Sequence, residues 1–186
     1  FVIGMVANIN YEKGVERFLN VANSVNANSA DCYFVIVGNV FESQRKYYQK
    51  LQDLCFELNI DNICFVQNCY DIRPILNRVD VYVCSSLQES SPVAVWEAIS
   101  MGKPIVSADV GDVPLYVKNH VNGYIESFEG FDAFSDRILS LKSDRKKCEE
   151  FGKKSRMIAI SQLDISNISK KQIKAYHSIL DSRNRE

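Results

Sequence analysis

The stretch SSLQESSPVAVWEAISMGKP, residues 85–104, is the part of the chain that best defines its fold. It has the pattern of a strand end, a polar loop and a helix. We expect the helix to begin at Pro92, because proline is favoured at the first helical position, and Ser91 to be its N-cap. Gly102 suits the position after the helix, and Pro104 prevents the helix from resuming. The unpaired N–H groups of such a helix N-terminus carry partial positive charge, which suits a phosphate.

Two carboxylates bracket this element. Glu89 lies in the loop before the expected helix, and Glu97 lies within the helix. This spacing allows the first to reach a reacting ligand while the second holds another part of the same ligand. Because such glutamate pairs also occur often by chance, the alternative is that both are ordinary surface residues.

Short apolar runs alternate with amphipathic segments along the whole chain. The runs expected to be strands are residues 1–8, 32–38, 63–66, 79–84, 105–108 and 123–125. The segments expected to be helices are residues 15–25, 43–58, 71–77, 92–101, 131–141, 144–160 and 166–182. This alternation predicts an α/β fold, a Rossmann-like doubly wound parallel sheet with helices on both faces, and residues 1–186 as one domain.

Polar groups follow most of the expected strands, at residues 8–14, 38–39, 67–70, 85–91 and 109–112. The carboxyl ends of parallel strands lie at one edge of a sheet, and ligands of doubly wound folds bind there. The sequence therefore predicts a single site that combines these loops.

The composition is that of a globular protein, with 46% hydrophobic and 24% charged residues. No apolar run is long enough for a membrane span, and no signal peptide pattern opens the chain. The six cysteines include no Cys-x-x-Cys pair, so we expect reduced thiols and a cytoplasmic protein. The chain has only two histidines, so a zinc site is not expected. We expect no other bound metal either. Because the chain opens directly on a strand pattern, we expect it to be a fragment of a longer protein.

The basic residues gather near the end of the chain. Residues 142–186 contain 12 Lys and Arg against 6 Asp and Glu. The simplest interpretation is the solvated face of two helices, and the alternative is weak peripheral contact with an anionic membrane surface. Because this charge lies away from the expected site, nucleic acid is not an expected partner.

The central stretch resembles the nucleotide-sugar site of retaining GT-B glycosyltransferases of family 4. The match runs through Glu89-Ser90-Ser91-Pro92, an apolar stretch, Glu97-Ala98, and Gly102-Lys103-Pro104-Ile105-Val106. The segment Glu12-Lys13-Gly14 also matches a family motif. The resemblance covers residues 3–180 and implies the C-terminal, donor-binding half of a two-domain enzyme. Its partner would be an N-terminal acceptor-binding domain of the same protein, on which the helix at residues 165–186 is a candidate to pack.

The resemblance also implies residue roles. Lys13 would contact the donor diphosphate, Glu97 the ribose hydroxyls and Glu89 the sugar ring. The remaining implied contacts to the donor lie in the loop and first helical turn, at Ser90, Ser91, Pro92 and Val93. Such family members need no cofactor beyond the nucleotide-sugar substrate and no essential metal, and we expect the same here.

Asn8 departs from the family pattern. The family usually places an arginine five residues before the lysine, where it would neutralise charge on the leaving group. An asparagine there leaves three alternatives: Lys13 and backbone amides suffice, another group supplies the charge, or activity is weak. Two further positions depart from the family pattern. Ser90 replaces a glycine that the family usually has. Gly111-Asp112 stands where the family often has two glycines, and here it is either a ligand contact or a simple turn.

The leading functional hypothesis is the donor-binding domain of a retaining glycosyltransferase. It would move a sugar from a UDP- or GDP-linked donor to a glycan or lipid-linked acceptor. The alternatives are a non-catalytic nucleotide-sugar-binding module and an unrelated doubly wound domain. A dinucleotide dehydrogenase is disfavoured because no Gly-x-Gly-x-x-Gly follows the first strand.

Overall fold

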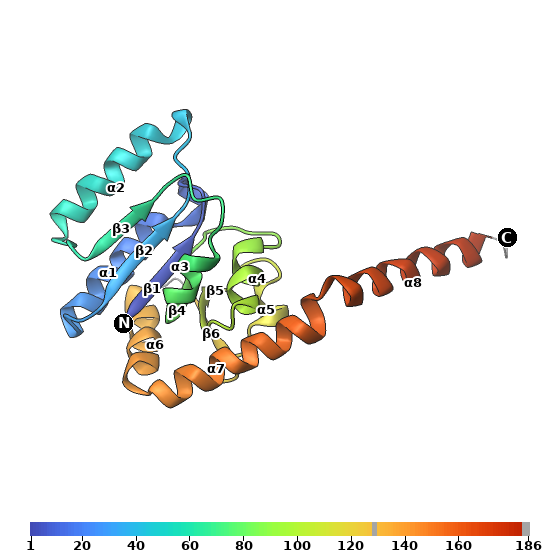
Figure 1. Cartoon of the computed structure of the whole chain (residues 1–186). Helices are drawn as coiled ribbons and strands as arrows, with labels where there is room; N and C mark the ends of the chain where they lie inside the picture. The colour runs from blue at the N-terminus through green and yellow to red at the C-terminus, as the bar shows by residue number, and fades with distance from the viewer. Residues whose placement is uncertain (128–129, 184–186) are drawn as a thin grey trace.

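The computed structural model describes residues 1–127 and 130–183, and its centre is a six-stranded parallel sheet (Figure 1). The strands are β1 (Val2–Val6), β2 (Tyr33–Val37), β3 (Ile63–Val66), β4 (Val81–Cys84), β5 (Ile105–Ala108) and β6 (Gly123–Glu126). Their spatial order is β3-β2-β1-β4-β5-β6, and all five pairs are parallel. This arrangement confirms the predicted Rossmann-like α/β fold.

Helices cover both faces of the sheet. They are α1 (Val15–Asn28), α2 (Arg45–Glu57), α3 (Arg73–Arg78), α4 (Val93–Ser100), α5 (Val113–Tyr116), α6 (Phe131–Ser143), α7 (Arg145–Ile158) and α8 (Ile165–Arg183). Two short 3₁₀ turns, Tyr11–Lys13 and Glu42–Gln44, and a π turn, Ala159–Leu163, complete the described elements.

Strand β4 shows why the sheet is buried on both sides. Its residues are all buried, and successive side chains point to opposite faces. Val81 and Val83 join the core beneath α1, α2 and α6, whereas Tyr82 and Cys84 join the core beneath α3, α4 and α5. A continuous apolar run is what a parallel strand buried on both faces requires.

The start of α4 corrects one prediction. The helix begins at Val93 with Pro92 as its N-cap, and Ser91 does not cap it. The Ser91 hydroxyl instead accepts a hydrogen bond from Trp96 Nε1 at 3.2 Å, so it is not turned to the backbone of the first turn. At the other end Gly102 has φ of +68°, the left-handed conformation expected just after a helix.

The last helices differ in how they are packed. Helix α7 contributes buried Phe151 and Gly152 to the domain, whereas α8 projects away from it (Figure 1). On α8 the side chains of Ile165 and Tyr176 are 79% and 65% exposed. None of the described helices combines the length and apolar character needed to cross a bilayer. All six cysteines are free thiols in the structure.

Candidate nucleotide-sugar site

A cavity lies where β1 and β4 are neighbours. The chain continues from β1 to β2 on one side, while β4 and β5 lie on the other, so this is the point at which the strand order reverses. The cavity has a volume of about 460 Å³ and is lined by the ends of β1, β2 and β4 and by the first turn of α4. Ligands of doubly wound folds bind in the crevice at this point.

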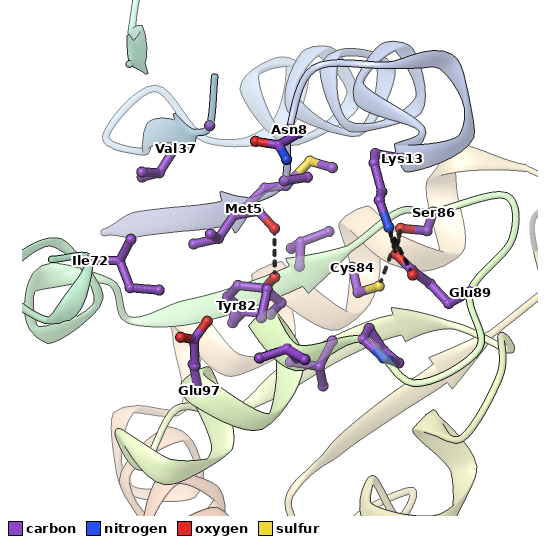
Figure 2. A pocket seen from close by; sticks show the side chains of 18 of the residues that line it. Met5, Asn8, Lys13, Val37, Ile72, Tyr82, Cys84, Ser86, Glu89 and Glu97 are labelled. Carbon is purple, nitrogen blue, oxygen red and sulfur yellow. Dashed lines mark hydrogen bonds and ion pairs between the residues drawn. The ribbon is translucent and has the colours of Figure 1, made fainter. Parts of the chain in front are cut away.

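Lys13 and Glu89 form an ion pair at one end of the cavity, although they lie 76 positions apart in the sequence (Figure 2). Lys13 Nζ donates to both carboxylate oxygens of Glu89 at 2.8 Å. The Ser86 hydroxyl donates to Glu89 Oε1, also at 2.8 Å. The side chains of Lys13 and Glu89 are 30% and 11% exposed, so the carboxylate is largely shielded while the ammonium remains accessible.

Two hydrogen bonds join the loop that carries Lys13 to the loop that carries Glu89. Leu87 N donates to Glu12 O at 2.8 Å, and the buried Ser85 hydroxyl donates to Gly14 O at 2.9 Å. Gly14 has φ of +63°, and a Cβ there would lie 2.0 Å from Ser85 O. The loop after β1 can approach the loop after β4 this closely because residue 14 is glycine.

Glu97 lies on the opposite side of the cavity from Glu89 (Figure 2). Its side chain is exposed at the rim, but partial shielding from solvent by the cavity wall raises the pKa of its carboxyl. Between the two carboxylates the first turn of α4 lines the cavity. Its N-cap offers no side-chain acceptor, and Val95 N donates to Pro92 O at 3.0 Å, which leaves the N–H groups of Val93 and Ala94 as candidates to meet an anion.

Apolar side chains form the floor of the cavity, among them Met5, Ile72 and Tyr82. Tyr82 is buried, its hydroxyl donates to Val6 O at 3.3 Å, and burial raises the pKa of that hydroxyl well above its ordinary value. Tyr82 is therefore a neutral structural residue beneath the site.

The loop at residues 109–112 contacts the backbone of the loop that carries Glu89 and Ser90. Asp112 N donates to Ser90 O at 2.8 Å, and a Cβ at Gly111 would lie 2.2 Å from the same oxygen. Gly111 and Asp112 are not among the residues that line the cavity, which favours their interpretation as a turn. Ser90 does not line it either, whereas Ser91, Pro92 and Val93 do.

Asn8 lines the cavity and is exposed. Its Oδ1 accepts a hydrogen bond from Asn39 N at 3.4 Å, and Asn39 Oδ1 in turn accepts one from Asn68 N at 2.8 Å. These amides connect the ends of β1, β2 and β3. Lys13 is the only cation among the described residues that line the cavity.

Sequence reasoning missed Ser86, which lines the cavity and binds Glu89. Its position three residues before Glu89 was the only available signal. Within the described part of the chain, no cluster of three or more His, Cys, Asp or Glu side chains is arranged to hold a metal ion.

A parallel sheet of this order, with the start of a helix and two carboxylates lining a cavity at its switch point, defines a Rossmann-like domain. More particularly, the chain belongs to the glycosyl transferases group 1 family, whose sequence profile matches residues 1–157.

Among its relatives, the spore coat protein SA of Bacillus subtilis is 27% identical over 182 residues, which cover 94% of this chain and 48% of that protein. The structure of HepE from Anabaena in complex with UDP superposes with a TM-score of 0.90 at 20% identity, covering 96% of this chain and 49% of that one. The C-terminal domain of LpcC, a glycosyl transferase group 1 family protein of Francisella tularensis, gives a TM-score of 0.80 at 20% identity, covering 89% and 87%.

These likenesses assign the fold to the C-terminal half of a GT-B glycosyltransferase. The chain spans less than half the length of the curated relatives it first matches.

Proposed function

We propose that this chain is the donor-binding domain of a retaining glycosyltransferase that uses a UDP- or GDP-linked sugar. The observation that carries the proposal is the Lys13–Glu89 pair facing Glu97 across one cavity at the switch point. The UDP bound to the structurally similar HepE supports a nucleotide ligand.

Each end of the cavity suits a different part of such a donor. Lys13 is accessible and lies on the same cavity as the first turn of α4, so together they suit the diphosphate. The exposed carboxylate of Glu97 suits the ribose, because it can accept hydrogen bonds from hydroxyl groups. The shielded carboxylate of Glu89 would face the transferred sugar.

Transfer requires groups beyond these. Lys13 and the α4 N-terminus would stabilise the departing diphosphate without a metal, and an acceptor-binding half would position the acceptor hydroxyl, on a glycan or lipid-linked saccharide. The exposed apolar side chains of α8 support packing of this helix on that half. The basic surplus of residues 142–186 supports weak contact with an anionic membrane surface.

A second candidate is a nucleotide-sugar-binding module without transfer. Asn8 favours it, because the position that carries an arginine in similar enzymes has no charge here and Lys13 is already paired with Glu89. In that case the donor would bind, but the leaving group would lack full charge stabilisation.

Calorimetry on the 186-residue chain tests the shared part of both candidates. We expect UDP or GDP, and the corresponding nucleotide sugar, to bind with micromolar to millimolar affinity and to lose affinity in Glu97→Ala. Absence of binding by UDP, GDP, UDP-glucose and GDP-mannose at millimolar concentration would reject the proposal. A transfer assay with the full two-domain protein and a panel of acceptors then distinguishes the two candidates, because only an enzyme would form a glycosylated product.

A further inference from the structure

Ser86 is a buried residue that lines the cavity, and the proposed function assigns it no role. It is 2% exposed, directly follows the buried Ser85, and lies just beyond the end of β4. The two adjacent serines serve different loops. Ser85 Oγ donates to Gly14 O, whereas Ser86 Oγ donates to Glu89 Oε1.

The two oxygens of Glu89 are not equivalent. Oε1 accepts hydrogen bonds from both Ser86 and Lys13, whereas Oε2 accepts one from Lys13. If the ammonium of Lys13 turns toward a diphosphate, Oε2 loses its donor and Oε1 keeps the Ser86 hydroxyl. The carboxylate then stays in place with one oxygen available.

The Ser86 hydroxyl is also an acceptor. The Cys84 thiol donates to Ser86 Oγ at 3.7 Å (Figure 2). Because Cys84 is buried, the pKa of its thiol is raised, so it remains a protonated donor. A hydroxyl that accepts from the thiol directs its own proton to Glu89.

We propose that Ser86 is a positioning residue for the donor sugar: it holds the Glu89 carboxylate in orientation, so that Oε2 accepts a sugar hydroxyl once Lys13 engages the diphosphate. The inference rests on the proposed function and adds a specificity element to it. Glu89 contacts the sugar, and Ser86 acts through Glu89.

Because Ser86 acts through Glu89, its contribution is confined to ligands that carry the sugar. Removing the hydroxyl frees the carboxylate to rotate and leaves Oε1 without its donor. We expect Ser86→Ala to weaken binding of the nucleotide sugar about ten-fold, the scale of one hydrogen bond to a charged group. The parent nucleoside diphosphate, which does not reach Glu89, is expected to bind unchanged.

Ser85→Ala is the matched control. It removes the same hydroxyl from an equally buried neighbour whose bond goes to the Gly14 backbone. We expect it to lower the melting temperature and to affect nucleotide and nucleotide sugar alike. Ser86→Cys keeps the size and a weak donor, so it is expected to lie between wild type and Ser86→Ala.

A double-mutant cycle on the 186-residue chain tests the inference. Calorimetry would use the tightest ligand among UDP-glucose, UDP-N-acetylglucosamine and GDP-mannose, with the parent UDP or GDP. In a Glu89→Ala background, Ser86→Ala or Ser86→Cys is expected to cause no further loss of nucleotide-sugar affinity.

Additive losses in this cycle, or equal losses for nucleotide and nucleotide sugar, would overturn the role of Ser86 and leave the proposed function standing. A wild-type chain that binds none of these ligands would overturn the proposed function itself. If Ser86→Ala does not fold, the same cycle with Ser86→Cys decides the question.

Discussion

Replacing Glu89 with alanine tests the division of roles between the two carboxylates most directly. In the structure Glu89 occupies two of the three N–H groups of Lys13, each at 2.8 Å. Removing the carboxylate releases the ammonium for a phosphate. It also removes one of the two negative charges on the cavity wall, the other being Glu97.

Glu89→Ala is expected to affect the nucleotide and the nucleotide sugar differently. The Lys13–Glu89 pair is partly exposed, so its net strength is about 1 kcal/mol, and Glu89→Ala is expected to leave UDP binding unchanged or to strengthen it by about five-fold. For a nucleotide sugar, hydrogen bonds to a charged group are lost, which costs about 1.5–3 kcal/mol. The ratio of the affinity for the nucleotide sugar to the affinity for UDP is therefore expected to fall by about ten-fold or more in Glu89→Ala.

Calorimetry with UDP and UDP-glucose on wild type, Glu89→Ala and Glu97→Ala measures this ratio. Glu97→Ala is the comparison variant, because it is expected to weaken both ligands by a similar factor through the ribose. A parallel loss of UDP affinity in Glu89→Ala and Glu97→Ala would refute the reasoning, since it would mean that both carboxylates contact the nucleotide.

Three further predictions concern charge and backbone geometry. Burial raises the pKa of the Glu97 carboxyl. Affinity for a nucleotide sugar is therefore expected to fall on acidification, at a higher pH than an ordinary glutamate would give. Glu97→Gln should abolish this pH dependence in a calorimetric titration. Gly14→Ala forces a Cβ against Ser85 O from a left-handed backbone, so we expect a loss of at least about 1–2 kcal/mol in the unfolding free energy, measured by urea denaturation. Asn8 is exposed on the cavity, so Asn8→Arg should leave the melting temperature intact and tighten UDP binding by about 1 kcal/mol; a large drop in melting temperature would instead show that Asn8 is structural.

The fold was predictable from sequence because its determinants are local. The apolar run of β4 and the spacing of Phe18, Leu19 and Ala22 on α1 predict a strand and a helix face, and the structure buries both. Helix ends were less predictable. Ser91 has the right chemistry for an N-cap, but the Trp96 indole binds its hydroxyl, and no local pattern anticipates that contact.

The site was predictable only in part. Lys13, Glu89 and Glu97 were identified from motifs, and the structure places all three on one cavity. Their ligand contacts remain predictions. Ser86 was missed because a serine at a strand end has no distinctive pattern, and its importance follows from a side-chain contact that exists only in the folded chain.

The adjacent serines Ser85 and Ser86 connect the two loops that carry Lys13 and Glu89. Both serines directly follow β4, which ends at Cys84. Ser85 bonds to the Gly14 carbonyl in the loop after β1, next to Lys13, while Ser86 bonds to the carboxylate that pairs with that lysine. The dipeptide thus contacts both the loop that carries Lys13 and the carboxylate of Glu89. If Lys13 turned to a phosphate, Glu89 would keep the hydrogen bond from Ser86, and the loop that carries Lys13 would keep the one from Ser85.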